Sequence, residues 1–334
     1  ALILAPEEGL QIAGITLPAF GLGIDGLVYG VIIGAALHLS IQIPGLIKFG
    51  FKWSPILDFK DEKFRRVLKL MEARLISMIF IQLIFLARDN LASRLATGSV
   101  TALSYGWWIQ QVPETLIGTA IATALLPTLS EHAAKKDKNA YSSTLERSLR
   151  VMIALSLPIT VIISLVSLPW IQLAFGFPIK EAQMVLWATR GYLVGLLGHC
   201  LVELGVRAFY ARQNARVPML ISGLGFIVYV GLAFPLMGTF ASGGIALANS
   251  ISYSLQAFFL IFLLNRKVSE KFKLGYVFSR AFISAAISWG CTWLILAVLP
   301  IHLNEIFLSI IAIVFACAVA VIPIWQDLRL VNRL

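Results

Sequence analysis

Charged residues are scarce in this sequence. Asp, Glu, Lys and Arg make up 13% of its 334 residues, while hydrophobic residues make up 59%. A soluble domain carries about 25% charged residues, so this composition argues against an ordinary soluble protein. The apolar runs are long and lack the alternation of barrel strands, which favours helices that cross a membrane. We predict an all-α, polytopic membrane protein.

Cysteine and histidine are also few, with three and four copies. Cys200, Cys291 and Cys317 fall in apolar runs, and none has the spacing of a metal ligand or of a disulfide framework. The sequence has no Walker loop, which argues against ATP hydrolysis. The loops also lack the acidic cluster that a membrane glycosyltransferase would need for a nucleotide-sugar. We expect no metal, no cofactor and a transporter rather than an enzyme.

The first residues, ALILAP, contain no initiator Met and no charged segment ahead of an apolar run. No signal peptide is therefore visible. The opening reads as the end of an apolar helix that began earlier, so we expect a C-terminal fragment of a longer protein.

Hydropathy divides the chain into nine predicted spans. A Gly-rich, weakly acidic segment precedes the first span, and basic loops or short turns separate the others. The predicted spans cover about residues 26–47, 67–91, 99–130, 151–175, 182–207, 219–237, 244–264 and 281–299, with a ninth that ends near 325.

The formal net charge of +10 would in a soluble protein suggest nucleic-acid binding. Here Lys and Arg gather in the loops after the first, third, fifth and seventh spans and in the tail after the ninth. The intervening segments hold only Arg88, Arg94 and Lys180. This bias is the positive-inside pattern. It predicts a cytoplasmic C-terminus and argues against a nucleic-acid partner.

Residues 99–138 form an apolar helix with one polar side. Thr101, Ser104, Trp108, Gln111, Thr115, Gly118, Thr119 and Thr123 recur at steps of three and four. Two explanations stay open, because small and hydroxyl residues allow close helix packing and a polar stripe can also line a water-filled cavity. Pro113 predicts a kink. Glu114 follows it as a carboxylate inside the span, which is by default a functional-site hypothesis.

The charges within or at the edge of the predicted spans are Arg74, Arg88, Asp89, Glu114, Arg190 and Glu203. Arg74 either extends back to the interface or faces an aqueous cavity that attracts an anion, with Gln82 two turns along the same face. Arg88 and Asp89 are expected to pair locally or with another helix. Arg190 and Glu203 are too far apart on one helix to pair directly.

Several motifs resemble one known family. They are Gln42-Ile43-Pro44, Arg74 with Gln82, Ala92-Ser93, Gly98-Ser99-Val100, Tyr105-Gly106, Pro113, the run from Ala122 to Ser130, and the run from Arg207 to Arg212 continuing to Pro218. Their order and spacing resemble the lipid II flippase family MurJ, also called MviN, in the MOP exporter superfamily. Members have fourteen helices, in two six-helix lobes plus two C-terminal helices, and this chain would hold the sixth to the fourteenth.

The resemblance implies three parts. Residues 1–66 would end the N-terminal lobe, 67–266 would form the C-terminal lobe, and 267–334 would form the two extra helices and a basic tail. The lobes would form an inverted V around a central cationic cavity for the pyrophosphate and sugar of lipid II. The polyprenyl tail would lie in a groove by the last two helices, and alternating access would carry the head group across the membrane.

The implied partners are a lipid-linked pyrophosphate precursor, membrane lipids and possible cell-wall synthesis proteins, in the bacterial cytoplasmic (inner) membrane. The expected cavity residues are Arg74, Gln82, Arg88, Trp108, Gln111 and Glu114. The alternatives are a flippase for another polyprenyl-linked oligosaccharide, a cation-coupled exporter, and a membrane scaffold that does not transport.

Three positions depart from the family pattern. Trp108 stands where members often have Arg, which would remove a pyrophosphate contact. Ala73 replaces a Pro before the matching Arg. The predicted span 219–237 has no Asp or Asn, which argues against the sodium coupling of some members.

Overall fold

The computed structural model describes residues 11–12, 15–16, 20–51, 61–268, 271–298 and 305–330, and the structural statements below concern these residues. The chain divides into two compact units, Ala1–Phe64 and Arg65–Leu334. We describe each unit by itself.

The first unit contains one long helix. In its described part, β1 (Gln11–Ile12) pairs antiparallel with β2 (Ile15–Thr16), and α1 covers Gly23–Lys48. These two-residue strands are the exception to the all-α prediction. The predicted span 26–47 is confirmed by α1, whose side chains are nearly all exposed and mostly apolar. Most of the predicted basic loop, residues 52–60, lies outside the described residues.

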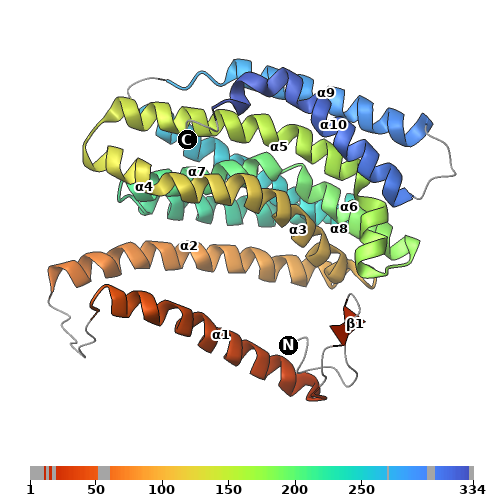
Figure 1. Ribbon diagram of the computed structural model, residues 1–334, viewed down its shortest axis with the longest axis horizontal. Helices are drawn as coiled ribbons and strands as arrows, with labels where there is room; N and C mark the ends of the chain where they lie inside the picture. The colour runs from red at the N-terminus through yellow and green to blue at the C-terminus, as the bar shows by residue number, and fades with distance from the viewer. Residues whose placement is uncertain are drawn as a thin grey trace. The chain divides into compact units, whose positions relative to one another are not determined.

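The second unit is a bundle of long helices (Figure 1). Its elements are α2 (Glu62–Ala92), α3 (Ser99–Glu114), the π-helical turn η1 (Thr115–Thr119), α4 (Ala120–Ala134), α5 (Lys138–Phe175), α6 (Ile179–Leu193), α7 (Leu196–Ala211), α8 (Arg216–Lys267), α9 (Gly275–Val298) and α10 (Glu305–Leu328). Asp137 caps α5 by accepting hydrogen bonds from the backbone N–H groups of Asn139 and Ala140. Helix α5 therefore begins at Lys138, well before residue 151, where the predicted span begins.

Backbone irregularity follows Pro113, as the sequence predicts. Proline removes one helical hydrogen bond, and the next turn, η1, is π-helical. Gly118 in η1 packs so close to α7 that an added Cβ would lie 2.9 Å from the Cα of Cys200. Segments α3, η1 and α4 thus form one irregular span. Pro158 and Pro169, by contrast, lie within the single helix α5.

Helices α6 and α7 are the two arms of a broken span. Their axes differ by 47° across Val194 and Gly195. The Ser250 hydroxyl donates hydrogen bonds to the carbonyls of Gly191 and Tyr192, at 2.7 and 3.0 Å. Ser250 therefore adds a donor to backbone carbonyls at the last turn of α6, where the helix breaks.

Helix α8 has 52 residues, a length of about 78 Å if it were straight. That is far more than the hydrocarbon thickness of about 30 Å. Ala241 interrupts it with φ 50 and ψ −131, outside the helical region. The Ser252 hydroxyl donates to the Gly225 carbonyl at 2.7 Å, so residues on either side of Ala241 lie side by side. Helix α8 is therefore a hairpin of two antiparallel spans.

This hairpin reconciles the number of spans with the prediction. By length and composition alone, the described residues contain seven candidate membrane helices, or eight if α6 and α7 form one span. Dividing α8 at Ala241 gives nine. Of the turns between predicted spans, the one at 299–304 lies outside the described residues.

The core of the second unit lies between α4, α5, α7 and α8, with Leu145, Met152, Cys200, Phe209 and Leu260 among its buried members. Helices α9 and α10 lie side by side and pack on α5 (Figure 1). The outer half of α2, from Ile84 to Ala92, joins a second cluster with α3, α6 and α8.

Candidate functional site

Arg74 and Gln82 project from the open side of α2. Both side chains are exposed, whereas Ala73 and Ser77 are buried. The Arg74 guanidinium interacts electrostatically with Tyr210 near the end of α7. Two of the predicted cavity residues are therefore accessible, and one of them lies near a second helix.

Arg88 and Asp89 pair locally, as one of the two sequence alternatives predicted. The guanidinium lies 2.8 Å from the Asp89 carboxylate. It also stacks 4.9 Å from the centroid of the Phe85 ring. The Arg88 side chain is mostly buried in this arrangement, so its predicted role in the cavity remains a prediction.

The polar side of α3, η1 and α4 is largely open. The exposed members of the predicted stripe are Thr101, Trp108, Gln111, Thr115 and Thr123. Ser104 and Thr119 are half-buried, and Gly118 alone is buried against another helix. Close packing explains Gly118 but not the other members. Most of the stripe therefore lies on an open face of the described structure, and a cavity lining remains a prediction.

Trp108, which replaces the arginine found in many family members, is 57% exposed. Its ring meets Tyr105 edge-on, with centroids 5.0 Å apart. The indole therefore occupies an open surface rather than a packed core.

Glu114 is buried, with 7% of its surface exposed. Gln110, one turn earlier, donates a hydrogen bond of 3.0 Å from Nε2 to the carboxylate. His199 of α7 lies 3.8 Å away, measured from its Nδ1 to Oε2. The structure thus places Glu114 behind the exposed stripe, between helices, rather than on the open surface with Gln111.

Glu203 and Arg207 of α7 connect these regions. They form an ion pair one helical turn apart, and both side chains are partly exposed. Glu203 interacts electrostatically with Glu114, and both Glu203 and Arg207 interact with Tyr210, which Arg74 also approaches. We call Arg74, Tyr210, Arg207, Glu203 and Glu114 the polar ladder. It joins α2, α7 and α3.

Sequence reasoning missed two of the residues in this region. Arg207 was assigned to the basic cytoplasmic loop, and His199 was treated as an isolated histidine. The signal that identifies them is the spacing of His199, Glu203 and Arg207 at steps of four, which places them on one side of a helix. Arg190, by contrast, donates to the Ser164 carbonyl of α5 and does not join the ladder.

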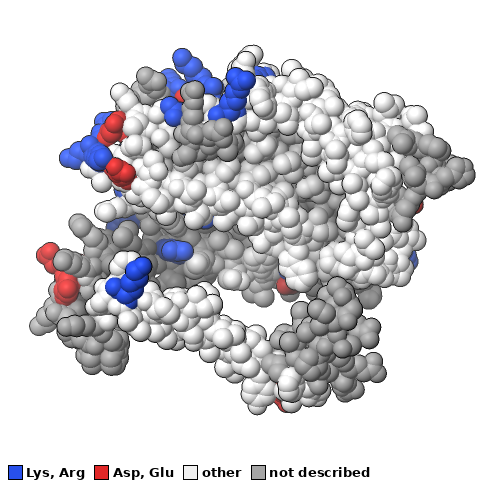
Figure 2. Space-filling view, viewed as in Figure 1, with Lys and Arg blue, Asp and Glu red and all other residues white. Residues whose placement is uncertain are grey.

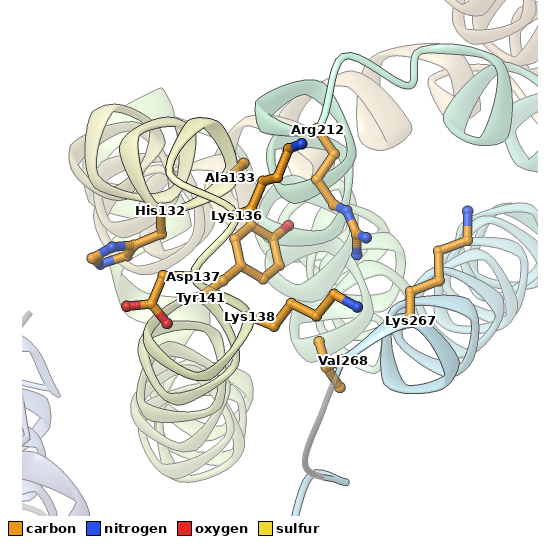
Figure 3. A pocket seen from close by; sticks show the side chains of 9 residues that line it. All are labelled: His132, Ala133, Lys136, Asp137, Lys138, Tyr141, Arg212, Lys267 and Val268. Carbon is orange, nitrogen blue, oxygen red and sulfur yellow. The ribbon is translucent and has the colours of Figure 1, made fainter.

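A basic pocket of about 250 Å³ lies where α4, α7 and α8 end and α5 begins (Figure 3). Its cations are Lys136, Lys138, Arg212 and Lys267, grouped around the ring of Tyr141. Figure 2 shows Lys and Arg gathered near the end where α4 passes into α5. This is a predicted cytoplasmic end, so the pocket fits the positive-inside pattern.

An apolar cavity of about 440 Å³ lies between α5, α7, α8 and the start of α9. Its lining residues include Ile153, Leu197, Phe258, Phe262 and Phe278. The cavity therefore reaches the first of the last two helices, where the family resemblance implies a groove for a polyprenyl tail.

Among the described residues, no group of three or more His, Cys, Asp or Glu side chains has the arrangement of a metal site. The three cysteines are free.

The family model for the lipid II flippase MurJ matches residues 11–320. This chain belongs to the MurJ family. Among curated relatives, the probable lipid II flippase MurJ of Haemophilus influenzae is 27% identical over 246 residues, covering 70% of this chain and 48% of the relative. The lipid II flippase MurJ of Burkholderia cenocepacia is 28% identical over 261 residues, covering 75% and 50%. The chain thus spans about half the length of these relatives.

Solved structures show the same fold. A lipid II flippase MurJ in an inward closed conformation superposes with a TM-score of 0.69 at 21% identity, covering 96% of this chain and 63% of that structure. A MATE transporter in a bent conformation gives a TM-score of 0.55 at 16% identity, covering 78% and 64%. The predicted MurJ resemblance and the MOP-type transporter fold are both confirmed. The chain is a multi-pass membrane protein of a bacterial family.

Proposed function

We propose that this chain forms part of a flippase that moves the lipid-linked peptidoglycan precursor, lipid II, across the bacterial cytoplasmic membrane by alternating access. Membership of the MurJ family carries this proposal. The protein would act as a transporter rather than an enzyme. Its substrate would have an anionic pyrophosphate, a sugar head and a long apolar chain.

The polar ladder supports the assignment of the pyrophosphate. Arginine matches phosphate oxygens with paired N–H donors. Arg74 is exposed and Arg207 is partly exposed. Gln82 and Gln111 are exposed too and add donors suited to sugar hydroxyls. The charges of this ladder are mixed, since Glu203 and Glu114 stand beside the two arginines.

The apolar cavity supports the assignment of the tail. Its lining is almost wholly apolar, with Ser254 and Asn265 as the polar exceptions. A polyprenyl chain in the membrane is already removed from water, and a cavity of this lining offers it a protein surface as apolar as lipid. We infer that the tail lies against α8 and α9 while the head group is carried.

The orientation follows from the loop charges. The positive-inside rule places the basic pocket and the C-terminus in the cytoplasm. A green fluorescent protein fused to the C-terminus should therefore fluoresce, whereas alkaline phosphatase fused there should be inactive. We also propose that the protein contacts cell-wall synthesis proteins.

Complementation tests the function. The complete gene would be expressed in a bacterium depleted of its own lipid II flippase, and we expect growth to be restored. Arg74→Ala should abolish rescue because it removes an exposed cation of α2 that lies near Tyr210 of α7. Arg94→Ala is the matched control, since Arg94 is exposed in the turn after the same helix and its guanidinium donates a hydrogen bond to the Asn90 side chain.

Two outcomes would contradict parts of the proposal. Absence of rescue with normal membrane insertion would point to another polyprenyl-linked substrate or a scaffold that does not transport. Full rescue by Arg74→Ala would remove Arg74 from the substrate site while leaving the flippase assignment in place.

A further inference from the structure

The pair formed by Glu114 and His199 differs from every other ion pair described in the structure. Its two side chains come from different helices, α3 and α7, and both are buried, with 1% of His199 exposed. The nearest approach is 3.8 Å, longer than a hydrogen bond. Neither partner has a permanent charge, because both carboxylate and imidazole can gain or lose a proton.

Polar atoms around this pair are left without partners. His199 uses Nε2 for a 3.1 Å hydrogen bond with Oδ1 of Asn249 on α8. Because that oxygen accepts, Nε2 carries the hydrogen, and Nδ1 faces Glu114 with no hydrogen-bond partner. Oε1 of Gln110 is also buried and unpaired in the described structure. Buried polar atoms normally have hydrogen-bond partners. These two atoms therefore leave unused hydrogen-bonding capacity where Glu114 and His199 meet.

Aromatic rings surround the imidazole. The Tyr253 ring stacks on it at a centroid distance of 3.8 Å and an interplanar angle of 17°. Trp107 approaches from another side, with centroids 5.4 Å apart. The imidazole is therefore enclosed by aromatic side chains, and its Nδ1 lies on the side of Glu114.

The other groups that face Glu114 do not fix its charge. Gln110 of α3 donates a hydrogen bond to it. Glu203 and Cys200 of α7 and Tyr253 of α8 interact with it electrostatically. No Lys or Arg within the described ranges forms an ion pair with Glu114. The carboxylate is thus buried with one titratable base and one further acid nearby.

Charge balance then requires one proton for the pair. Without it, Glu114 is an unpaired negative charge away from water, which is costly. With one proton, the pair is neutral overall, whether the proton resides on the carboxyl oxygen or on Nδ1. A single proton also supplies a donor between two atoms that otherwise both act as acceptors.

The pair lies beside two irregular stretches of helical backbone. Glu114 immediately precedes the π-helical turn η1, and His199 lies in the first turn of α7, after the break at Val194 and Gly195. Asn249 is adjacent to Ser250, which bridges that break. In transporters, ion sites form where helices are discontinuous, and π-helical turns also occur often at functional sites.

We propose that Glu114 and His199 form a proton-binding site within the membrane, and that a proton binds there together with the anionic head group of the substrate. The coupling part rests on the proposed function. The proton passes from water to the Glu114 carboxylate or His199 Nδ1 and returns to water when the head group leaves. Glu203 and Arg207 follow His199 along α7, and both side chains are partly exposed. They provide a polar route between the pair and water.

The polar ladder explains the coupling. With Glu114 ionised, the charges of Arg74, Arg207, Glu203 and Glu114 sum to zero. Proton uptake changes the sum to +1. A pyrophosphate bound near Arg74 is then attracted more strongly, and by linkage its binding favours proton uptake.

Infrared spectroscopy tests the site directly. The full chain would be purified into lipid nanodiscs, and difference spectra recorded from about pH 5 to about pH 8, the range in which histidine pairs titrate. We expect a protonated carboxyl band that changes with pH and is missing in Glu114→Gln. Asp327→Asn is the matched control, because it removes a buried carboxylate that already has an arginine partner, Arg280 of α9.

Binding of inorganic pyrophosphate tests the coupling. Pyrophosphate itself titrates, so variants are compared at each pH. Relative to Glu114→Gln, the affinity of the unmodified chain should fall with rising pH by up to about tenfold per pH unit for one coupled proton. Because Gln mimics the protonated acid, the two should agree at low pH.

The outcomes separate the two proposals. An unchanged carboxyl band in Glu114→Gln would overturn the proton site. A Glu114-dependent band without pyrophosphate binding at any pH would instead overturn the head-group assignment and leave the proton site standing. If Glu114→Gln does not insert, the pH dependence of Trp107 fluorescence, isolated by comparison with Trp107→Phe, reports proton uptake by the Glu114–His199 pair in the native chain, because Trp107 lies against the imidazole. A Trp107 signal that does not change with pH would then overturn the proposal.

Discussion

Two carboxylates within the helical bundle have opposite kinds of partner. Asp327 of α10 is 2% exposed and lies 3.3 Å from the guanidinium of Arg280 on α9. Arg280 also donates to the Pro323 carbonyl at 2.7 Å and to the Gln326 side chain at 3.1 Å. Glu114 is almost as buried, but its ionisable partner is His199.

The partner determines what each carboxylate can do. Arginine stays protonated at every physiological pH, so the Arg280–Asp327 pair is permanent and joins α9 to α10. Histidine changes charge near neutrality, so the Glu114–His199 pair can change its protonation without unfolding. A buried carboxylate thus holds two helices together in one place and forms part of a candidate proton-binding site in another.

Breaking the permanent pair should have the largest effect on stability. Arg280→Ala leaves Asp327 buried without its cation, and removal of one partner from a buried pair costs about 3–5 kcal/mol. We expect a corresponding loss in the free energy of unfolding, measured by denaturant titration in detergent micelles. Arg329→Ala is the control, since Arg329 is exposed on the same end of α10. Equal losses in both variants would show that the pair contributes nothing specific.

Packing around the titratable pair should give the next largest effect. Gly118→Ala places a Cβ 2.9 Å from the Cys200 backbone, next to His199. Overpacking of this kind costs about 1–3 kcal/mol, and it should also alter the pH response of the neighbouring pair. Gly290→Ala on α9 meets nothing within 4 Å and should be neutral or stabilising. Thermal unfolding of the two variants provides the measurement, and similar melting temperatures would contradict the close contact.

The comparison also shows what the sequence could predict. The spans followed from hydropathy, and the local Arg88–Asp89 pair followed from adjacency, because both depend on nearby residues. The partners of Glu114 and Asp327 did not, since His199 and Arg280 come from other helices, and periodicity within one helix does not show which helix packs against it. Both Arg280 and Asp327 were placed outside the predicted spans, whereas α9 begins at Gly275 and α10 continues to Leu328.

The exposed stripe was predictable for a related reason. Its period of three and four residues is a property of one helix, and the structure confirms that most of it is open. The burial of Glu114 was not predictable from that period, because it depends on how η1 approaches α7. Helical position identifies a face, but a second helix decides which of its members remain accessible.

Neutralising the titratable carboxylate should change stability little. Glu114→Gln keeps an acceptor for the Gln110 amide and removes the need for a buried charge, so we expect a change within about 1 kcal/mol. Asp327→Asn should cost more, because Arg280 would lose its counter-ion. Denaturant titration of the two variants at one pH gives the comparison. A larger loss for Glu114→Gln than for Asp327→Asn would assign Glu114 a structural role.

A cation added at Trp108, on the open face of α3, should have the smallest effect on stability and should act mainly on the binding of pyrophosphate. Trp108 is exposed and contacts chiefly Tyr105, so Trp108→Arg should change the free energy of unfolding by no more than about 0.5 kcal/mol. The new guanidinium adds positive charge to the stripe without touching either buried pair, so affinity for inorganic pyrophosphate should rise. Trp108→Gln is the uncharged control. A rise with Gln equal to that with Arg would mean that relief of steric blocking, rather than charge, strengthens binding.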